Sequence, residues 1–137
     1  MSELSYLMLT GSLSGLVSVL GHAVVGSAMD LLRERGGHGA LSGAPPVLFS
    51  DALLHMLCGT GLGLLFWLSW GLAAVVDVPW WVRGLSFGSL CWLALALPSA
   101  LSVALARDLT LKAAAVIASR WASTCLIAGL ACAWSWR

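Results

Sequence analysis

Apolar residues run along the chain in four long stretches, separated by short polar or turn-forming segments. The stretches cover residues 5–28, 50–76, 80–104 and 113–136. Each is long enough to supply the roughly 20 apolar residues that a helix needs to cross a bilayer core. The pattern predicts an all-α membrane protein with four transmembrane helices in a compact bundle, forming a single domain over residues 1–137.

The segments between the stretches carry signals that end and begin helices. Gly36 and Gly37 follow a basic turn and predict a helix end, and residues 36–46 read as a loop rich in Gly and Pro. Asp108 is the expected cap of the fourth helix, because its carboxylate can accept from a free backbone N–H. Pro98 lies late in the third stretch and predicts a kink, since proline removes a helical hydrogen bond.

Composition supports the same class of protein. Hydrophobic residues make up 60% of the chain and charged residues 9%, whereas soluble domains carry about 25% charged residues. Most of the surface must therefore face lipid or other apolar protein. The net charge of +1 argues against nucleic acid as a partner, because phosphate binding needs clustered cations. The N-terminus lacks the basic region of a removable signal peptide, so we expect the first helix to be retained.

Aromatic residues and cations gather at opposite sets of predicted helix ends. The aromatic residues are Tyr6, Trp67, Trp70, Trp80, Trp81, Trp134 and Trp136, and the cations are Arg33, Arg35, Arg107, Lys112 and Arg120. Trp and Tyr favour membrane interfaces, and Lys and Arg are in excess in cytoplasmic loops. This sorting predicts a multi-pass protein of the bacterial inner membrane. Both termini are expected outside the cytoplasm and loop 36–46 inside it.

Small residues recur at four-residue spacing in every predicted helix. The pairs are Gly11 and Gly15, Gly59 and Gly63, Gly84 and Gly88, and Ser119 and Ser123. In lipid, helices associate through close backbone approach over such faces. The glycines therefore predict tight helix packing. They leave open a second reading, in which one face is spare and binds a second copy or another membrane protein.

Ionisable residues at membrane depth are costly and mark candidate functional sites. A rise of about 1.5 Å per residue, counted from the aromatic ends, places His22, His55 and Arg120 in one layer near the cytoplasmic boundary. Asp51 and His55 are four residues apart, so they share a helix face and can pair. The candidate site is this polar layer, with Ser99 as a neighbour. The alternatives are that Arg120 reaches the headgroups and that each histidine makes only a helix–helix hydrogen bond.

The sequence supports a cofactor site less than it supports the polar layer, and we expect no cofactor and no metal site. A haem is the alternative, since His22 and His55 can be placed as two axial ligands, with Gly21, Gly26 and Gly59 leaving room for the macrocycle. The four cysteines lie inside apolar stretches without a CxxC pair, which favours a packing role. Residues 84–88 have the spacing GxSxG, but they lie inside a predicted transmembrane helix and not at the strand-to-helix turn that a serine nucleophile of this kind needs, and no phosphate-binding loop occurs in the sequence. An enzyme is therefore not expected.

One segment resembles a known group of proteins. The second predicted helix contains His55-x-x-x-Gly59-x-x-x-Gly63-x-x-Phe66, and Arg83-Gly84-x-x-x-Gly88 begins the third. This pattern resembles that of small bacterial four-helix inner-membrane proteins of unknown function. The resemblance implies the same fold and location and carries no activity.

The sequence thus favours a non-enzymatic integral membrane protein, acting through helix packing as a small subunit or an oligomeric module. Its expected partners are the lipid bilayer and either a second copy or another membrane protein. The first alternative is a small-solute transporter or channel that uses the polar layer. The second is a b-type haem or redox membrane protein.

Overall fold

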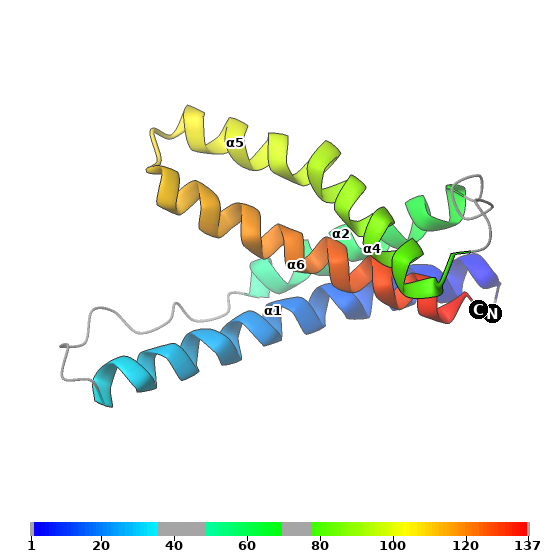
Figure 1. Cartoon of the computed structure of the whole chain (residues 1–137), viewed down its shortest axis with the longest axis horizontal. Coiled ribbons are helices and arrows are strands. Elements are labelled where there is room, and N and C mark those ends of the chain that lie inside the picture. The colour runs from blue at the N-terminus through cyan, green and yellow to red at the C-terminus, as the bar shows by residue number, and fades with distance from the viewer. Residues whose placement is uncertain (1, 36–48, 70–77, 137) are drawn as a thin grey trace.

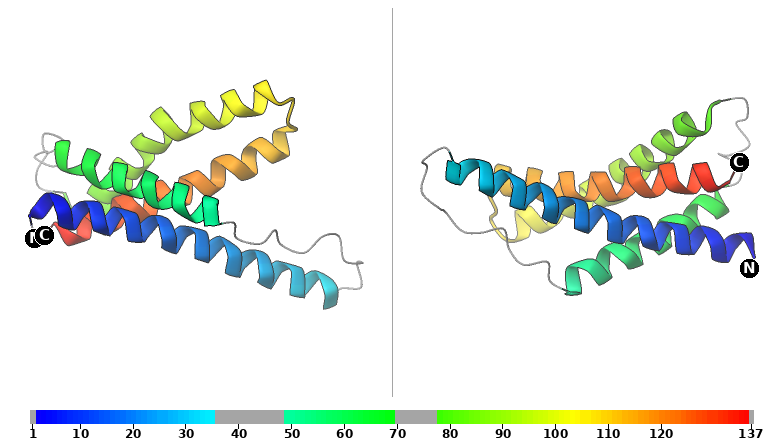
Figure 2. Two further views of the ribbon diagram at one scale, coloured as in Figure 1. Left: turned by 180° about the vertical axis from the view of Figure 1, so that it is seen from behind. Right: turned by 90° about the horizontal axis from the view of Figure 1, so that it is seen from below.

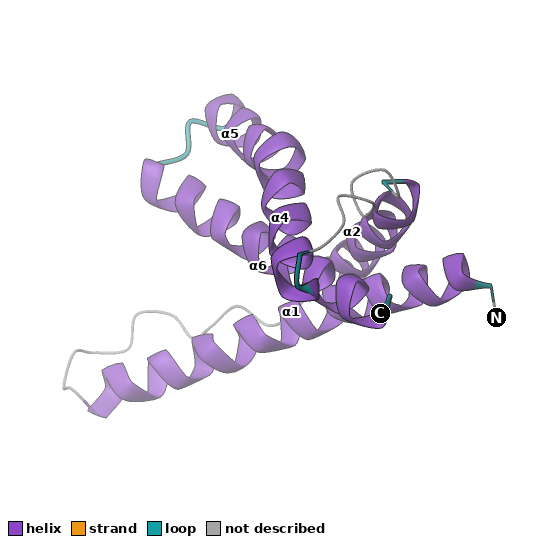
Figure 3. Cartoon of the chain, turned by 45° about the vertical axis from the view of Figure 1, so that its right-hand side comes forward, coloured by secondary structure: helices purple, strands orange, loops and turns teal. Residues whose placement is uncertain are grey.

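The computed structural model describes residues 2–35, 49–69 and 78–136, and all regular structure in these ranges is helical (Figures 1 and 3). The helices are α1 (Glu3–Arg35), α2 (Phe49–Leu68), α4 (Trp80–Cys91), the π-helical segment η1 (Trp92–Ala96), α5 (Leu97–Ala106) and α6 (Leu111–Ser135). Segments α4, η1 and α5 follow one another without a break and form one long helix, called the third helix below.

Four helices are long and apolar enough to cross a membrane: Glu3–Met29, Phe49–Leu68, Trp80–Ala106 and Leu111–Ser135. The prediction of an all-helical chain with four such helices is confirmed. The expected loop 36–46 lies outside the described residues, as does the end of the second stretch beyond residue 69.

The helices pack most closely at one end of the molecule. The start of α1 and the end of α6 lie at that end, close to the N and C markers (Figures 1 and 2). Towards the opposite end, the hairpin of α5 and α6 diverges from the second half of α1 (Figures 1 and 3). The structure is therefore a closed bundle at one end and an open one at the other.

The crossing of α1 and α2 depends on glycine. Gly11 packs against Gly59, Gly15 packs against the carbonyl group of His55, and Gly63 packs against the α1 backbone. A Cβ atom added at any of these glycines would overlap a carbonyl oxygen of the facing helix. Close backbone approach of this kind is the main source of helix association in lipid.

A second glycine crossing joins α4 to α6. Gly84 packs against Gly129, and Gly88 packs against the backbone of Cys125. Gly129 has no glycine at four-residue spacing in the sequence and was not among the predicted packing residues. All six predicted packing glycines contact another helix of the same chain. They are thus not available as a spare face for a partner.

The apolar core fills the closed end between the two crossings. Its buried residues are Leu7, Leu62, Phe66, Phe87, Cys125, Ala128, Cys132 and Ala133. The rings of Phe66 and Phe87 meet edge to face with their centroids 5.0 Å apart, a favoured geometry for an aromatic pair. Cys125 and Cys132 are free and fully enclosed, so they pack as small apolar side chains.

The irregularity predicted near Pro98 takes the form of a π-helical turn. Segment η1 (Trp92–Ala96) lies immediately before α5, in which Pro98 is the second residue. Proline cannot donate to the carbonyl of Ala94, four residues earlier, and its ring crowds that group. A wider turn relieves the crowding. The indole Nε1 of Trp92 donates to the carbonyl of Ala118 at 2.9 Å and ties this turn to α6.

The prediction that Asp108 caps the fourth helix is wrong. The cap of α6 is Thr110, whose hydroxyl accepts from the backbone N–H of Ala113 at 3.3 Å. Asp108 instead adopts a left-handed backbone conformation with φ 49° in the turn before it. Asp tolerates this conformation better than most residues, so its role is to reverse the chain.

The glycine crossing can be tested on one helix with a matched pair of variants. We expect Gly59→Ala to lower the free energy of unfolding by about 1–3 kcal/mol, the usual cost of overpacking, because its Cβ would meet the carbonyl oxygen of Gly11. Gly61→Ala is the control, since nothing lies within 4 Å of its added Cβ. Unfolding in detergent micelles, followed by circular dichroism, measures both. Equal stability of the two variants would contradict the crossing.

Candidate functional site

An ion pair joins α2 to α6 where these helices approach α1. The guanidinium Nη2 of Arg120 donates to Oδ2 of Asp51 at 2.5 Å. The other carboxylate oxygen, Oδ1, lies 3.6 Å from Nε2 of His55, one turn further along α2. Three of the four predicted site residues are therefore in one cluster. The carboxylate of Asp51 lies at its centre, between a permanent cation and a titratable ring.

The His55 side chain is buried between α2 and α6. It is 3% exposed. Its Nδ1 lies 2.8 Å from Oγ1 of Thr124 on α6. One face of its ring stacks on the indole of Trp121, with centroids 4.3 Å apart and planes 11° apart. Both ring nitrogens thus face polar groups, as a buried histidine requires.

Hydroxyl groups extend the cluster to α1. Thr124 Oγ1 donates to Ser18 Oγ at 2.9 Å, and Ser18 Oγ lies 2.9 Å from Ser123 Oγ. Ser123 in turn donates to the backbone carbonyl of Arg120 at 2.7 Å. Thr124 and Ser18 are fully buried. The result is a continuous row of hydrogen bonds from His55 across the contact of α1, α2 and α6.

His22 is at the edge of this arrangement. Its Nδ1 lies 2.8 Å from the carbonyl oxygen of Ser18, one turn earlier on α1. Its ring is half-buried and makes no hydrogen bond to Asp51, His55 or Arg120. The structure therefore places His22 beside the cluster rather than in it.

Exposure falls steeply from the ion pair to the hydroxyl groups. The side chains of Arg120 and Asp51 are 37% and 29% exposed, whereas Thr124 is 0% exposed. The ion pair is thus the accessible end of the cluster. Arg120 uses its guanidinium to bind Asp51, and its long stem still leaves part of the group at the surface.

Sequence reasoning missed the residues that complete the cluster: Ser18, Trp121, Ser123 and Thr124. Their spacing carried a signal, because Ser18 precedes His22 by four residues and Thr124 follows Arg120 by four. Such pairs share a helix face. The expected neighbour Ser99 is not part of the cluster, since its hydroxyl donates to the carbonyl of Leu95 at 2.7 Å.

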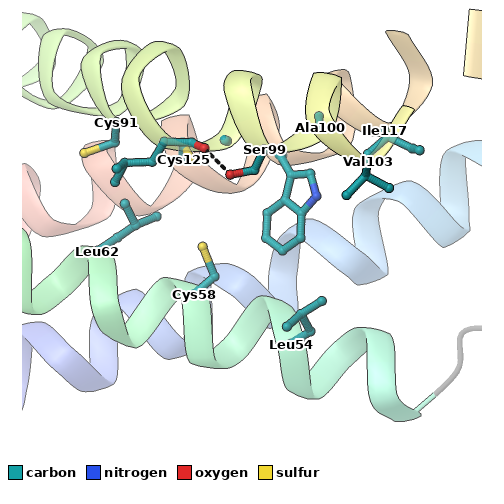
Figure 4. A pocket seen from close by; sticks show the side chains of 12 residues that line it. Leu54, Cys58, Leu62, Cys91, Ser99, Ala100, Val103, Ile117 and Cys125 are labelled. Atoms are coloured by element: carbon teal, nitrogen blue, oxygen red, sulfur yellow. Dashed lines mark hydrogen bonds between the residues drawn. The ribbon is translucent and has the colours of Figure 1, made fainter. Parts of the chain in front are cut away.

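A groove of about 470 Å³ lies beside the cluster, between α2, the third helix and α6 (Figure 4). Its lining is mostly apolar and includes Leu54, Cys58, Cys91 and Cys125. Trp121 also lines it, so the indole that stacks on His55 forms part of the groove wall. A volume of this size is within the range of small-molecule pockets.

The geometry does not fit the haem alternative. An axial ligand needs a free ring nitrogen facing an open space, but Nδ1 of His55 faces Thr124, Nε2 faces Asp51, and Trp121 covers a ring face. Gly59 leaves no room for a macrocycle, because it is packed against Gly11. Among the described residues, no group of three or more His, Cys, Asp or Glu side chains is arranged to hold a metal ion.

Comparison with known proteins gives no relative from which a role can be transferred: no family model, curated protein or solved structure matches the chain. The site must be interpreted from its own geometry. Within the described residues, Asp51, His55 and Arg120 form the one ion-paired group. A transporter or channel, the first functional alternative, would depend on this single layer.

The coupling between Asp51 and Arg120 can be measured with a double-mutant cycle. We expect Asp51→Asn and Arg120→Gln to destabilise the protein individually, and the double variant to lose less than the sum. The difference should be about 0.5–3 kcal/mol, the range for residues in one network. Unfolding in detergent measures each variant.

A second cycle is the control for the first. Arg120→Gln combined with Asp108→Asn should be additive, since Asp108 lies in the turn before α6 and makes no ion pair in the described structure. Additivity of the Asp51 cycle as well would show that the ion pair does not act as a unit.

Proposed function

We propose that the chain is a non-enzymatic integral membrane protein that acts as a small subunit or an oligomeric module. The observation that carries this proposal is the unequal burial of the four helices. The most apolar 18-residue window of Trp80–Ala106 is 11% buried, whereas those of the other three helices are 28–33% buried. The third helix therefore has the smallest buried share of the four, which leaves most of its apolar window free to contact another membrane protein.

The proposed docking side is rich in leucine rather than glycine. Exposed residues of the third helix include Leu85, Leu90, Leu93, Leu101 and Leu105. The glycine pairs, which first suggested a spare face, are used inside the chain. A partner helix would therefore pack against long side chains, at the usual interaxial distance of about 8–10 Å rather than in close backbone contact.

Photo-crosslinking in native membranes tests this proposal. We expect a photoreactive amino acid at Leu93 or Leu101 to give a crosslinked product, either a dimer or a complex with another membrane protein. The same group at Val24 on α1 is the control, because that side chain is 68% exposed to the surroundings but lies outside the proposed side. Native mass spectrometry of the purified protein identifies the partner. A monomer without crosslinks at any position would overturn the proposal.

We further propose that the protein resides in the bacterial inner membrane with both termini on the non-cytoplasmic side. The excess of Lys and Arg around loop 36–46 and residues 107–112 supports this orientation. The location of the start of α1 and the end of α6 at one end of the molecule is compatible with it (Figure 2).

A reporter that is active only in the cytoplasm tests the orientation. Fused to the C-terminus, the reporter should be inactive, and inserted into loop 36–46 it should be active. Both fusions must be present in the membrane fraction at similar levels for the comparison. An active C-terminal fusion with an inactive loop insertion would reverse the assignment.

A further inference from the structure

The hydroxyl groups next to His55 form a row with a fixed direction. The row ends at the backbone carbonyl of Arg120, which can only accept a hydrogen bond. Ser123 donates its hydroxyl hydrogen to this carbonyl at 2.7 Å. A hydroxyl group has one hydrogen, so Ser123 Oγ must accept in its contact with Ser18 at 2.9 Å.

The same counting continues along the row. Ser18 uses its hydrogen on Ser123, and it therefore accepts from Thr124, whose hydroxyl donates to it at 2.9 Å. The Thr124 hydroxyl oxygen also lies 3.3 Å from the Arg120 carbonyl oxygen. Thr124 has one hydroxyl hydrogen, which these two acceptors share, so Thr124 is the donor in both contacts. Its oxygen consequently accepts from Nδ1 of His55 at 2.8 Å, and Nδ1 must carry a hydrogen.

We infer that Nε2 of His55 is a proton-binding site. With Nδ1 held as a donor, Nε2 is the ring nitrogen left to gain or lose a proton. In the neutral ring, its lone pair faces Oδ1 of Asp51 across 3.6 Å. When the lone pair takes up a proton, Nε2 becomes an N–H that faces the carboxylate, and the cluster gains one positive charge. The proton comes from hydronium in the adjoining water, whose O–H bond breaks as the N–H bond forms and which is left as a water molecule.

Charged and titratable groups surround this nitrogen from each helix packed against it. Asp51 on α2 lies 3.6 Å from Nε2 and is itself paired with Arg120 on α6, and His22 on α1 lies beside the cluster. The indole face of Trp121 lies against the ring and stabilises its cationic form. The surroundings of Nε2 thus include one carboxylate, one aromatic face and two cationic or titratable side chains.

The path of the proton is open at one end. Asp51 is 29% exposed and lies next to Nε2, so it links the buried ring to the surface. On the other side, the row of hydroxyls ends at a carbonyl oxygen, which cannot pass a proton on. The arrangement is thus a binding site rather than a conducting row, and it stands independently of any docking partner.

Nitrogen-15 NMR of the whole protein in lipid bicelles, with labelled histidine, tests the inference. The His55 signals are those removed by His55→Gln. We expect neutral His55 to carry its hydrogen on Nδ1, and acidification to protonate Nε2 while Nδ1 stays protonated. A neutral ring with its hydrogen on Nε2 would overturn the inference. So would a ring that keeps one charge state between about pH 5 and pH 8, the range in which histidines usually titrate.

Two substitutions at Thr124 test whether its hydroxyl sets the tautomer of His55 or only fills space between the helices. Thr124→Val removes the acceptor of Nδ1 at nearly equal volume and should release the neutral ring to the other tautomer. Thr124→Ser keeps the hydroxyl and should preserve the Nδ1 hydrogen. If Thr124→Val prevents folding, Ser123→Ala is the second variant. It frees Ser18 to donate to Thr124, which should populate both tautomers. Unchanged tautomers in every folded variant would contradict the directed row.

Discussion

The backbone contact between α1 and α2 determines where the polar residues of this protein meet. Gly11 and Gly59 lie against each other, and Gly15 lies against the carbonyl of His55. This contact holds the helices closer than any side chain would permit. It also fixes the rotation of α1, and with it the position of Ser18 next to Thr124 and Ser123. Packing and polar chemistry therefore depend on the same few glycines.

The membrane-spanning helices contain two kinds of polar contact, an ion pair and a row of hydroxyl hydrogen bonds, and these contribute differently to stability. The ion pair of Asp51 and Arg120 is partly exposed, so its surroundings share in its solvation and its contribution to stability is limited. The row of hydroxyls is buried, and each of its members has a partner. An unsatisfied group there would cost about 1–3 kcal/mol. The row therefore contributes mainly by defining one arrangement of the three helices.

The sequence predicted those features that depend on composition or local spacing. The four helices follow from stretch length, and the contact between Asp51 and His55 follows from a four-residue spacing on one helix. The bond from Thr124 to Ser18 depends on the rotation of two separate helices, and each residue turns a helix by about 100°. A small error in rotation moves a short hydroxyl out of reach. The cap at Thr110 was missed because a left-handed Asp108 shifts the helix start.

Trp121 connects the polar cluster to the groove. Its indole stacks on His55 and also lines the groove between α2, the third helix and α6. Thermodynamic linkage follows from this sharing. A molecule in the groove that favours one charge state of the neighbouring ring would shift the proton equilibrium of that ring. The charge on the ring would change the affinity of the groove by the same factor. Binding in an apolar groove would in this way be sensitive to pH.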